Sequence, residues 1–291
     1  NLTKGLQAFA IGLFKKVIIA DNFGKIVSYG YLNIPQINSL EAILTIVSYT
    51  IQIYFDFSGY CDMATGVALM FNIKLPMNFN SPYKATTITD FWKRWHITLT
   101  RFLTKYVYIP LGGNRRGKIR TYINIFFVFL LSGVWHGAGY TFILWGILHG
   151  IANVLCRCCS KIVNKIPSWL NWICNFIFLN ITWAVFRAES IGQAKQLLWR
   201  IGAGGFRINA ELTEILLQPT LISIPAQIFP FFAVVIGYTS LVMLISVCAK
   251  NTNEIINREQ SNVGSLIFTY ILFIVSVLSL SGVSAFLYFN F

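Results

Sequence analysis

Charged residues are scarce in this sequence. Only 11% of its 291 residues are Asp, Glu, Lys or Arg, whereas 56% are hydrophobic. Soluble domains carry about 25% charged residues, so this deficit excludes an ordinary soluble protein. Together with a mean hydropathy of +0.63, it indicates an integral membrane protein.

Acidic residues are the scarcer of the two charge types: 10 stand against 23 basic residues, which gives a formal net charge of +13. Such an excess can indicate nucleic-acid binding, but here the basic residues flank apolar runs instead of covering one face. This arrangement follows the positive-inside rule, so we expect contacts with membrane lipid and none with nucleic acid. The six cysteines have the spacing of neither a zinc site nor a disulfide framework, and no metal is predicted.

The distribution of apolar runs predicts an all-α fold, a polytopic transmembrane helical bundle with short re-entrant or interfacial helices. A spanning helix needs about 20 apolar residues. About six or seven spans are expected, and because the chain starts at Asn1 without a signal peptide, we interpret residues 1–291 as one membrane domain that lacks its N-terminal helices. The predicted apolar segments cover residues 6–20 (short or interfacial), 40–57, 59–73, 121–156 and 169–186, one run that begins after Pro230 and ends near Lys250, and one from 266 almost to 291; residues 191–199 are amphipathic.

Residues 90–108 have a different pattern. Large apolar side chains recur at spacings of three and four, and basic residues occupy much of the opposite face. This pattern predicts one amphipathic helix that lies along the membrane. Thr87 and Asp90 resemble a capping box at its start, and Pro110 with the glycines after it ends the helix.

His136 is the leading candidate for chemistry. It lies sixteen residues after Arg120, or about 24 Å along a helix, so we expect it well inside the membrane. Gly137 and Gly139 predict a helix break beside it, where a neutral imidazole could act as a general base. The alternative is a histidine that hydrogen-bonds a neighbouring helix. Basic clusters at both ends of residues 121–156 leave two paths open, a hairpin and a single crossing.

The other ionisable residues leave alternatives open. For His149 we expect a packing role, and His96 lies on the border of the amphipathic helix. Asp56 and Asp62 could pair with Arg94 or Arg101 as a structural feature, or could line a polar cavity.

Three blocks resemble the membrane-bound O-acyltransferase superfamily, and the match is densest over residues 1–150. They are "YFDFSGYCDMATG", the segment "LPMNFNSPYKATTITDFWKRWHITLTRFLTKYVYIPLGGNRRGKIRTYIN", and "LLSGVWHGAGYTFILWGILHG". The resemblance is closest to the alginate O-acetyltransferase membrane subunit. It implies a tunnel with His136 as the catalytic residue at its constriction and His96 as a second functional position. Candidate substrate or tunnel-lining residues are Asp56, Asp62, Trp92, Asn114, Arg115 and Trp135.

The resemblance implies an enzyme of the bacterial cytoplasmic membrane that moves an acyl group, most simply acetyl, onto a hydroxyl of a cell-surface polysaccharide. The expected donor is acetyl-CoA or another acyl thioester, with no bound cofactor and with an extracytoplasmic partner acetyltransferase. The loop of residues 115–120 could hold the phosphates of the donor or could be a positive-inside anchor. The oxyanion could be bound by backbone amides near Gly137 or by the Trp135 N–H. Alternatives are D-alanyl transfer to teichoic acid, a transporter without covalent chemistry, and a passive scaffold.

Overall fold

The computed structural model describes residues 1–209, 212, 231–257 and 263–280. The described residues are mostly helical and contain no strand, which confirms the all-α prediction. They form two compact units, one of Asn1–Pro76 with Trp199–Asn290 and one built from Met77–Leu198.

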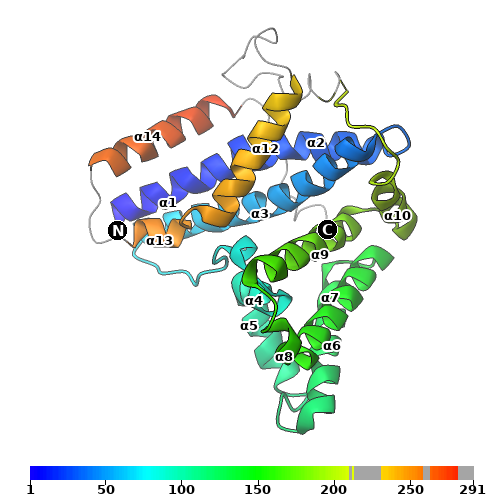
Figure 1. Cartoon of the computed structure of the whole chain (residues 1–291). Coiled ribbons are helices and arrows are strands. Elements are labelled where there is room, and N and C mark those ends of the chain that lie inside the picture. Colours follow the sequence, from blue (N-terminus) through cyan, green and yellow to red (C-terminus); the bar gives the residue numbers. More distant parts are fainter. Residues whose placement is uncertain (210–211, 213–230, 258–262, 281–291) are drawn as a thin grey trace. The chain divides into compact units, whose positions relative to one another are not determined.

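The first unit is organised around a long helix, α3 (Ser39–Met70). A continuous rod runs beside α3 (Figure 1) and consists of α1 (Leu2–Phe14), the π-helix η1 (Lys15–Ala20) and α2 (Asp21–Leu32). The later helices of this unit are α12 (Phe231–Cys248), α13 (Thr252–Ile256) and α14 (Val263–Leu278).

The prediction of two separate segments at 40–57 and 59–73 is wrong, because α3 continues through Gly59. A Cβ atom at Gly59 would lie 2.8 Å from the carbonyl oxygen of Gly12 on α1, and one at Gly12 would lie 2.6 Å from the carbonyl oxygen of Gly59. Gly59 therefore allows two helix backbones to touch, as small residues do in membrane proteins, and does not end the helix. Asn38 and Glu41 form a reciprocal capping box at the start of α3.

The second unit contains every histidine of the chain. Its helices are η2 (Pro82–Lys84), α4 (Ile88–Arg94), α5 (Ile97–Leu103), the π-helix η3 (Thr104–Tyr108), α6 (Gly117–His136), α7 (Tyr140–Cys158), α8 (Ser160–Val163), α9 (Ser168–Arg187) and α10 (Ile191–Arg200), which reaches the boundary of the unit. Helices α9 and α10 confirm the predicted segments 169–186 and 191–199.

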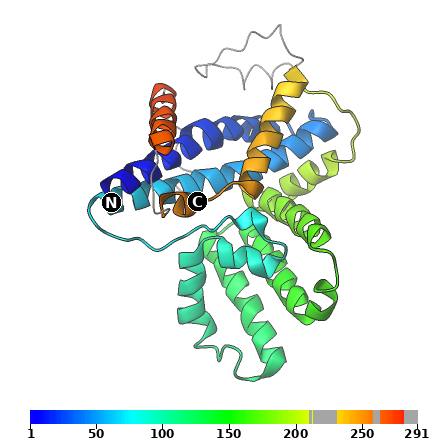
Figure 2. The ribbon, with the colours of Figure 1, turned by 60° about the vertical axis from the view of Figure 1, so that its left-hand side comes forward.

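Helices α6 and α7 form an antiparallel hairpin, seen side by side in Figures 1 and 2. Their backbones meet where a Cβ at Gly146 would lie 2.6 Å from the carbonyl oxygen of Phe129. Gly137 has φ +156°, and a Cβ there would lie 2.8 Å from the Phe142 ring, so the turn requires glycine. The break predicted beside His136 is confirmed, and of the two open paths the chain takes the hairpin.

Among the described residues, four helices are long and apolar enough to cross a membrane: Ser39–Met70, Gly117–His136, Tyr140–Cys158 and Ser168–Arg187. Two shorter apolar helices cover Val235–Cys248 and Val263–Leu278. The predicted total of six or seven spans stays a prediction, because the end of the segment expected from 266 to 291 lies outside the described residues.

The amphipathic region is not the single helix predicted over residues 90–108. It is divided into α4, α5 and η3, and the chain turns between the first two at His96, which has φ +44° and ψ +55°. The predicted cap at its start is present, since the Thr87 hydroxyl accepts a hydrogen bond from the Asp90 amide at 3.2 Å. The helical region ends at Tyr108, just before Pro110, as expected.

Candidate functional site

His136 is the last residue of α6 and lies within an aromatic cluster. It is 8% exposed. The centroid of its ring lies 5.3 Å from that of Trp145 on α7 and 5.2 Å from that of Phe186 on α9, both in edge-to-face geometry. The hairpin turn and α9 therefore place a buried imidazole at the end of a spanning helix.

His96 occupies the turn between α4 and α5, and Asn78 orients its ring. The Asn78 side-chain oxygen accepts hydrogen bonds from the amide and the hydroxyl of Thr98, at 3.2 and 2.9 Å, which identifies it as the acceptor. His96 Nδ1 lies 3.2 Å from the same oxygen, so Nδ1 carries the proton and Nε2 carries the lone pair. Burial lowers the pKa of His96 to about 4, which keeps the ring neutral near pH 7.

The backbone around His96 is held by the same upstream segment. The amide of Ile97 donates to the Asn78 carbonyl at 3.0 Å, and the amide of Asn80 donates to the Arg94 carbonyl at 2.9 Å. A left-handed conformation costs a non-glycine residue about 1 kcal/mol or more, so surrounding contacts of this kind are needed to maintain it.

His149 is fully buried and hydrogen-bonded on both ring nitrogens. Trp92 Nε1 donates to its Nδ1 at 3.1 Å, and an indole nitrogen can only donate. Nε2 therefore carries the proton and donates to the Thr182 hydroxyl at 3.1 Å, which in turn donates to the Leu179 carbonyl at 3.0 Å. This saturated chain joins α4, α7 and α9, and it gives His149 a packing role.

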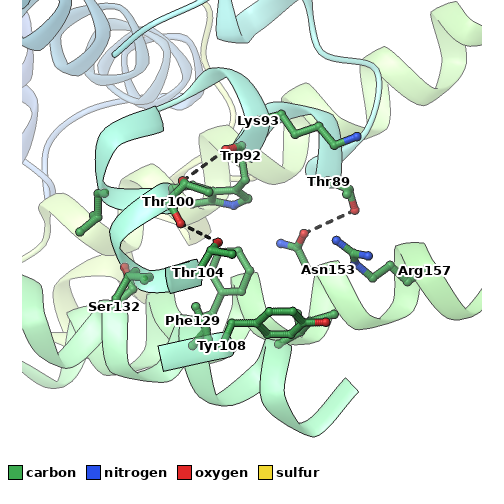
Figure 3. Close-up of a pocket in the computed structure, with 14 residues that line it drawn as sticks. Thr89, Trp92, Lys93, Thr100, Thr104, Tyr108, Phe129, Ser132, Asn153 and Arg157 are labelled. Atoms are coloured by element: carbon green, nitrogen blue, oxygen red, sulfur yellow. Dashed lines mark hydrogen bonds between the residues drawn. The ribbon is translucent and has the colours of Figure 1, made fainter. Parts of the chain in front are cut away.

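A cavity of about 310 Å³ lies between the α4–α5–η3 segment and the α6–α7 hairpin, and no histidine belongs to its lining. Trp92, Thr100 and Ser132 line it, and each is four residues in the sequence from His96 or His136. Ser132 and Arg157 lie at opposite sides of the cavity (Figure 3). The complete lining is Thr89, Trp92, Lys93, Leu99, Thr100, Leu103, Thr104, Tyr108, Ile125, Val128, Phe129, Ser132, Asn153 and Arg157.

The polarity of the cavity differs from one side to the other. Lys93 and Arg157 are exposed, and the Asn153 side chain is hydrogen-bonded to the Thr89 hydroxyl at 3.4 Å (Figure 3). No carboxylate belongs to the lining. The cavity therefore combines two cations with a wall of aromatic and aliphatic side chains, which suits an anionic ligand that has an apolar or neutral arm.

Of the residues predicted from the sequence to contact substrate, only Trp92 lines this cavity. Asn114 and Arg115 lie in the exposed loop before α6, outside the lining. Trp135 is 58% exposed, and its ring contacts that of His136 at a centroid distance of 4.9 Å.

Asp56 and Asp62 lie in the first unit, on α3, and form ion pairs with lysines of η1. Lys16 Nζ is 2.6 Å from Asp56 and 2.9 Å from Asp21. Lys15 Nζ is 2.6 Å from Asp62, whose same oxygen also accepts from the Thr252 hydroxyl at 2.5 Å.

Of the two alternatives for these aspartates, the ion pair is present, but its partners are not the arginines expected from the sequence. Lys15 and Lys16 are the partners of these aspartates. Arg94 forms an ion pair with Asp90 on its own helix, with 2.9 Å between Arg94 Nε and the Asp90 carboxylate.

Sequence reasoning missed several residues of the site. In the sequence, Lys93 is one of the basic residues on one face of 90–108, and Arg157 belongs to the basic cluster after residue 156. The sequence pattern singles out neither Asn78 nor Asn153 as a site residue. Asn153 had a usable signal, because a buried amide one helical turn after His149 in an apolar helix indicates a polar interior face. Lys93 and Arg157 lie far apart in the sequence, and only the tertiary fold places them on one cavity.

The fold is that of a helical membrane protein, and comparison with known proteins gives its class. The sequence model of MBOAT, the membrane-bound O-acyltransferase family, matches residues 1–190. The chain belongs to this family, and it is an integral membrane protein.

The names of curated relatives of this chain refer to different polymers. A peptidoglycan O-acetyltransferase of Helicobacter pylori is 44% identical over the whole of this chain and 57% of its own length. A probable alginate O-acetylase of Pseudomonas aeruginosa is 42% identical over 74% of this chain and 41% of its own length. A teichoic acid D-alanyltransferase of Bacillus subtilis is 33% identical over 58% of this chain and 44% of its own length.

Proposed function

We propose that this chain forms the catalytic part of an O-acetyltransferase that moves an acetyl group from a thioester donor toward a hydroxyl of a cell-surface polysaccharide. The observation that carries the proposal is the buried His136 at the hairpin turn, packed edge-to-face against Trp145 and Phe186. Membership of the acyltransferase family and the names of the two O-acetyl-transferring relatives support it.

His136 acts as the general base in this proposal. It takes the proton of the acceptor hydroxyl while the oxygen attacks the thioester carbonyl carbon, and it later returns the proton to the departing thiolate. His96 stays neutral, because burial lowers its pKa to about 4, and Asn78 holds the proton on Nδ1. It therefore does not supply a positive charge.

The cavity between the α4–α5–η3 segment and the α6–α7 hairpin holds the donor arm. Thioester donors of the pantetheine type carry phosphate at the end remote from the sulfur. Lys93 and Arg157 supply cations on one side of the cavity, and Ser132 on the other side is four residues, about 6 Å along α6, from His136. This arrangement favours those two cations over the loop at 115–120 as the phosphate site.

The bacterial cytoplasmic membrane is the proposed location, with the polysaccharide acceptor on its outer side. An extracytoplasmic partner acetyltransferase would complete the transfer to the polymer. The chain spans between 41% and 61% of the length of the first curated relatives it matches, so donor, acceptor and partner are proposals about the whole protein.

D-alanyl transfer is the second candidate, and the Bacillus subtilis relative favours it. A D-alanyl group carries an ammonium, which calls for a carboxylate or another acceptor near the acyl group. The cavity lining has two cations and no carboxylate, which favours a neutral acetyl group.

The test of the base is transfer of label from acetyl-CoA to surface polysaccharide in membranes that contain the protein. His136→Ala should abolish transfer at matched protein level, whereas Lys118→Ala, a substitution of an exposed residue outside the cavity, should not. Full labelling by a correctly inserted His136→Ala protein would refute the proposal. Labelling from a D-alanyl thioester but not from acetyl-CoA would support the second candidate.

The donor site has its own test. Arg157→Met should raise the KM for acetyl-CoA with a smaller effect on kcat, because it removes binding to a part of the donor remote from the reaction. Arg116→Met, in the exposed loop outside the cavity, is the matched control. If Arg116→Met raised KM and Arg157→Met did not, the loop would be the phosphate site.

A further inference from the structure

Two buried tryptophans in the aromatic cluster have indole N–H groups without a hydrogen-bond acceptor. Trp145 and Trp183 are each 1% exposed, and among the described residues no acceptor lies within reach of either Nε1. Their rings stack, with centroids 6.0 Å apart and an interplanar angle of 20°. Of the two, Trp145 packs against the His136 ring, at 5.3 Å.

An unpaired donor in such a place needs an explanation. A buried polar group without a partner destabilises the folded protein, and most buried indole N–H groups find an acceptor. Two neighbouring tryptophans show the usual behaviour, since Trp92 donates to His149 and Trp172 donates to the Tyr83 carbonyl at 2.8 Å. Of the two exceptions, Trp145 contacts the His136 ring, and it also contacts the His149 ring at 4.7 Å, whose two nitrogens are already hydrogen-bonded.

We propose that Trp145 Nε1–H is the donor that binds the carbonyl oxygen of the acetyl group and stabilises the oxyanion formed during transfer. This inference rests on the proposed function, in which His136 is the base. It assigns the role to Trp145 and not to Trp135, because the Trp135 side chain is 58% exposed and a water-accessible donor stabilises an oxyanion less than a buried one.

The chemical step balances with the groups named. His136 takes the proton of the acceptor hydroxyl, and the oxygen forms a bond to the carbonyl carbon. The carbonyl π pair moves onto the oxygen, where the Trp145 N–H donates to the negative charge. Return of that pair re-forms the carbonyl and breaks the carbon–sulfur bond, and the thiolate takes the proton from His136. No oxidant, reductant or metal takes part in this step.

The decisive variant replaces only the N–H group. Incorporation of benzothienyl-alanine at position 145 exchanges the indole N–H for sulfur and keeps the ring system. For Trp145 we expect kcat to fall by about a hundred-fold or more, the usual effect of losing one oxyanion donor, with little change in the KM for acetyl-CoA. Thermal stability should not fall, because the N–H removed has no acceptor in the protein.

The same replacement at Trp172 is the matched control. It removes an N–H that bonds to the Tyr83 carbonyl, so stability should fall while kcat is kept. A purely structural role for Trp145 predicts that the variant at position 145 keeps kcat, as the control does. Unchanged kcat at position 145, or a loss of kcat at Trp183 but not at Trp145, would overturn the proposal.

A second measurement does not depend on turnover. The probe is acetyl-CoA with a methylene in place of the thioester sulfur and a ¹³C label in its carbonyl. In the wild-type protein the infrared carbonyl stretch of the bound probe should lie below its value in solution, and the variant at 145 should lose most of that shift. Failure of the wild-type protein to bind the probe would count against the proposed function, whereas equal shifts in both proteins would count against Trp145 alone.

Discussion

Lys16→Met should destabilise the protein more than its modest side-chain change suggests. The ammonium lies 2.6 Å from Asp56 and 2.9 Å from Asp21, and the three side chains are only 9%, 3% and 16% exposed. With an effective dielectric constant of about 20, each pair attracts by about 6 kcal/mol, and the desolvation of the three groups offsets most of this. Removing one partner of a buried pair leaves uncompensated charge, which costs about 3–5 kcal/mol.

The assay is the free energy of unfolding in mixed micelles. The control is Asp90→Asn, which breaks the ion pair between Asp90 and Arg94. The side chains of Arg94 and Asp90 are 31% and 33% exposed, so this substitution should cost less than about 1 kcal/mol. Adding Asp56→Asn to Lys16→Met should recover part of the loss, since it neutralises the more deeply buried carboxylate. If Lys16→Met cost no more than Asp90→Asn, the reasoning about unpaired buried charge would be refuted.

Two further predictions concern the histidines. His149→Leu leaves the Trp92 N–H unpaired and should cost about 1–3 kcal/mol of unfolding free energy. A double-mutant cycle with Trp92→Phe should be clearly non-additive, and additive losses would contradict the hydrogen bond. Because the pKa of His96 is about 4 in the folded protein and about 6.5 when unfolded, its contribution to stability is complete above pH 6.5 and is lost as the pH falls toward 4. His96→Asn should flatten this part of the pH dependence of the melting temperature, and an unchanged slope would contradict the assignment.

Hydrophobic patterns predicted the elements whose signals are local. The apolar run of α9 and the amphipathic face of α10 appear at the expected residues, Thr87 caps α4, and the glycines after His136 break the helix. In each case the determining residues lie within a few positions of the feature. Local physical chemistry is sufficient there.

The failures share one cause, which is that distant residues decide the local structure. Nothing near His96 in the sequence indicates a helix break, and Asn78, eighteen residues earlier, supplies the hydrogen bonds that hold it. Gly59 looks like a helix end until Gly12 of another helix is placed against it. The candidate site shows the same division, since His136 was predicted, whereas the cations of the cavity and the unpaired Trp145 required the fold.

The hairpin of α6 and α7 also has a consequence for biosynthesis. Only three residues separate the two helices, and their backbones touch at Gly133 and Gly146. We therefore expect the two helices to insert into the bilayer as a pair. His136 and the glycines beside it are carried by a pair of apolar helices, whose combined insertion free energy offsets the cost of the polar turn. A substitution that separates the two helices would therefore lower the efficiency of membrane insertion, before any substrate is bound.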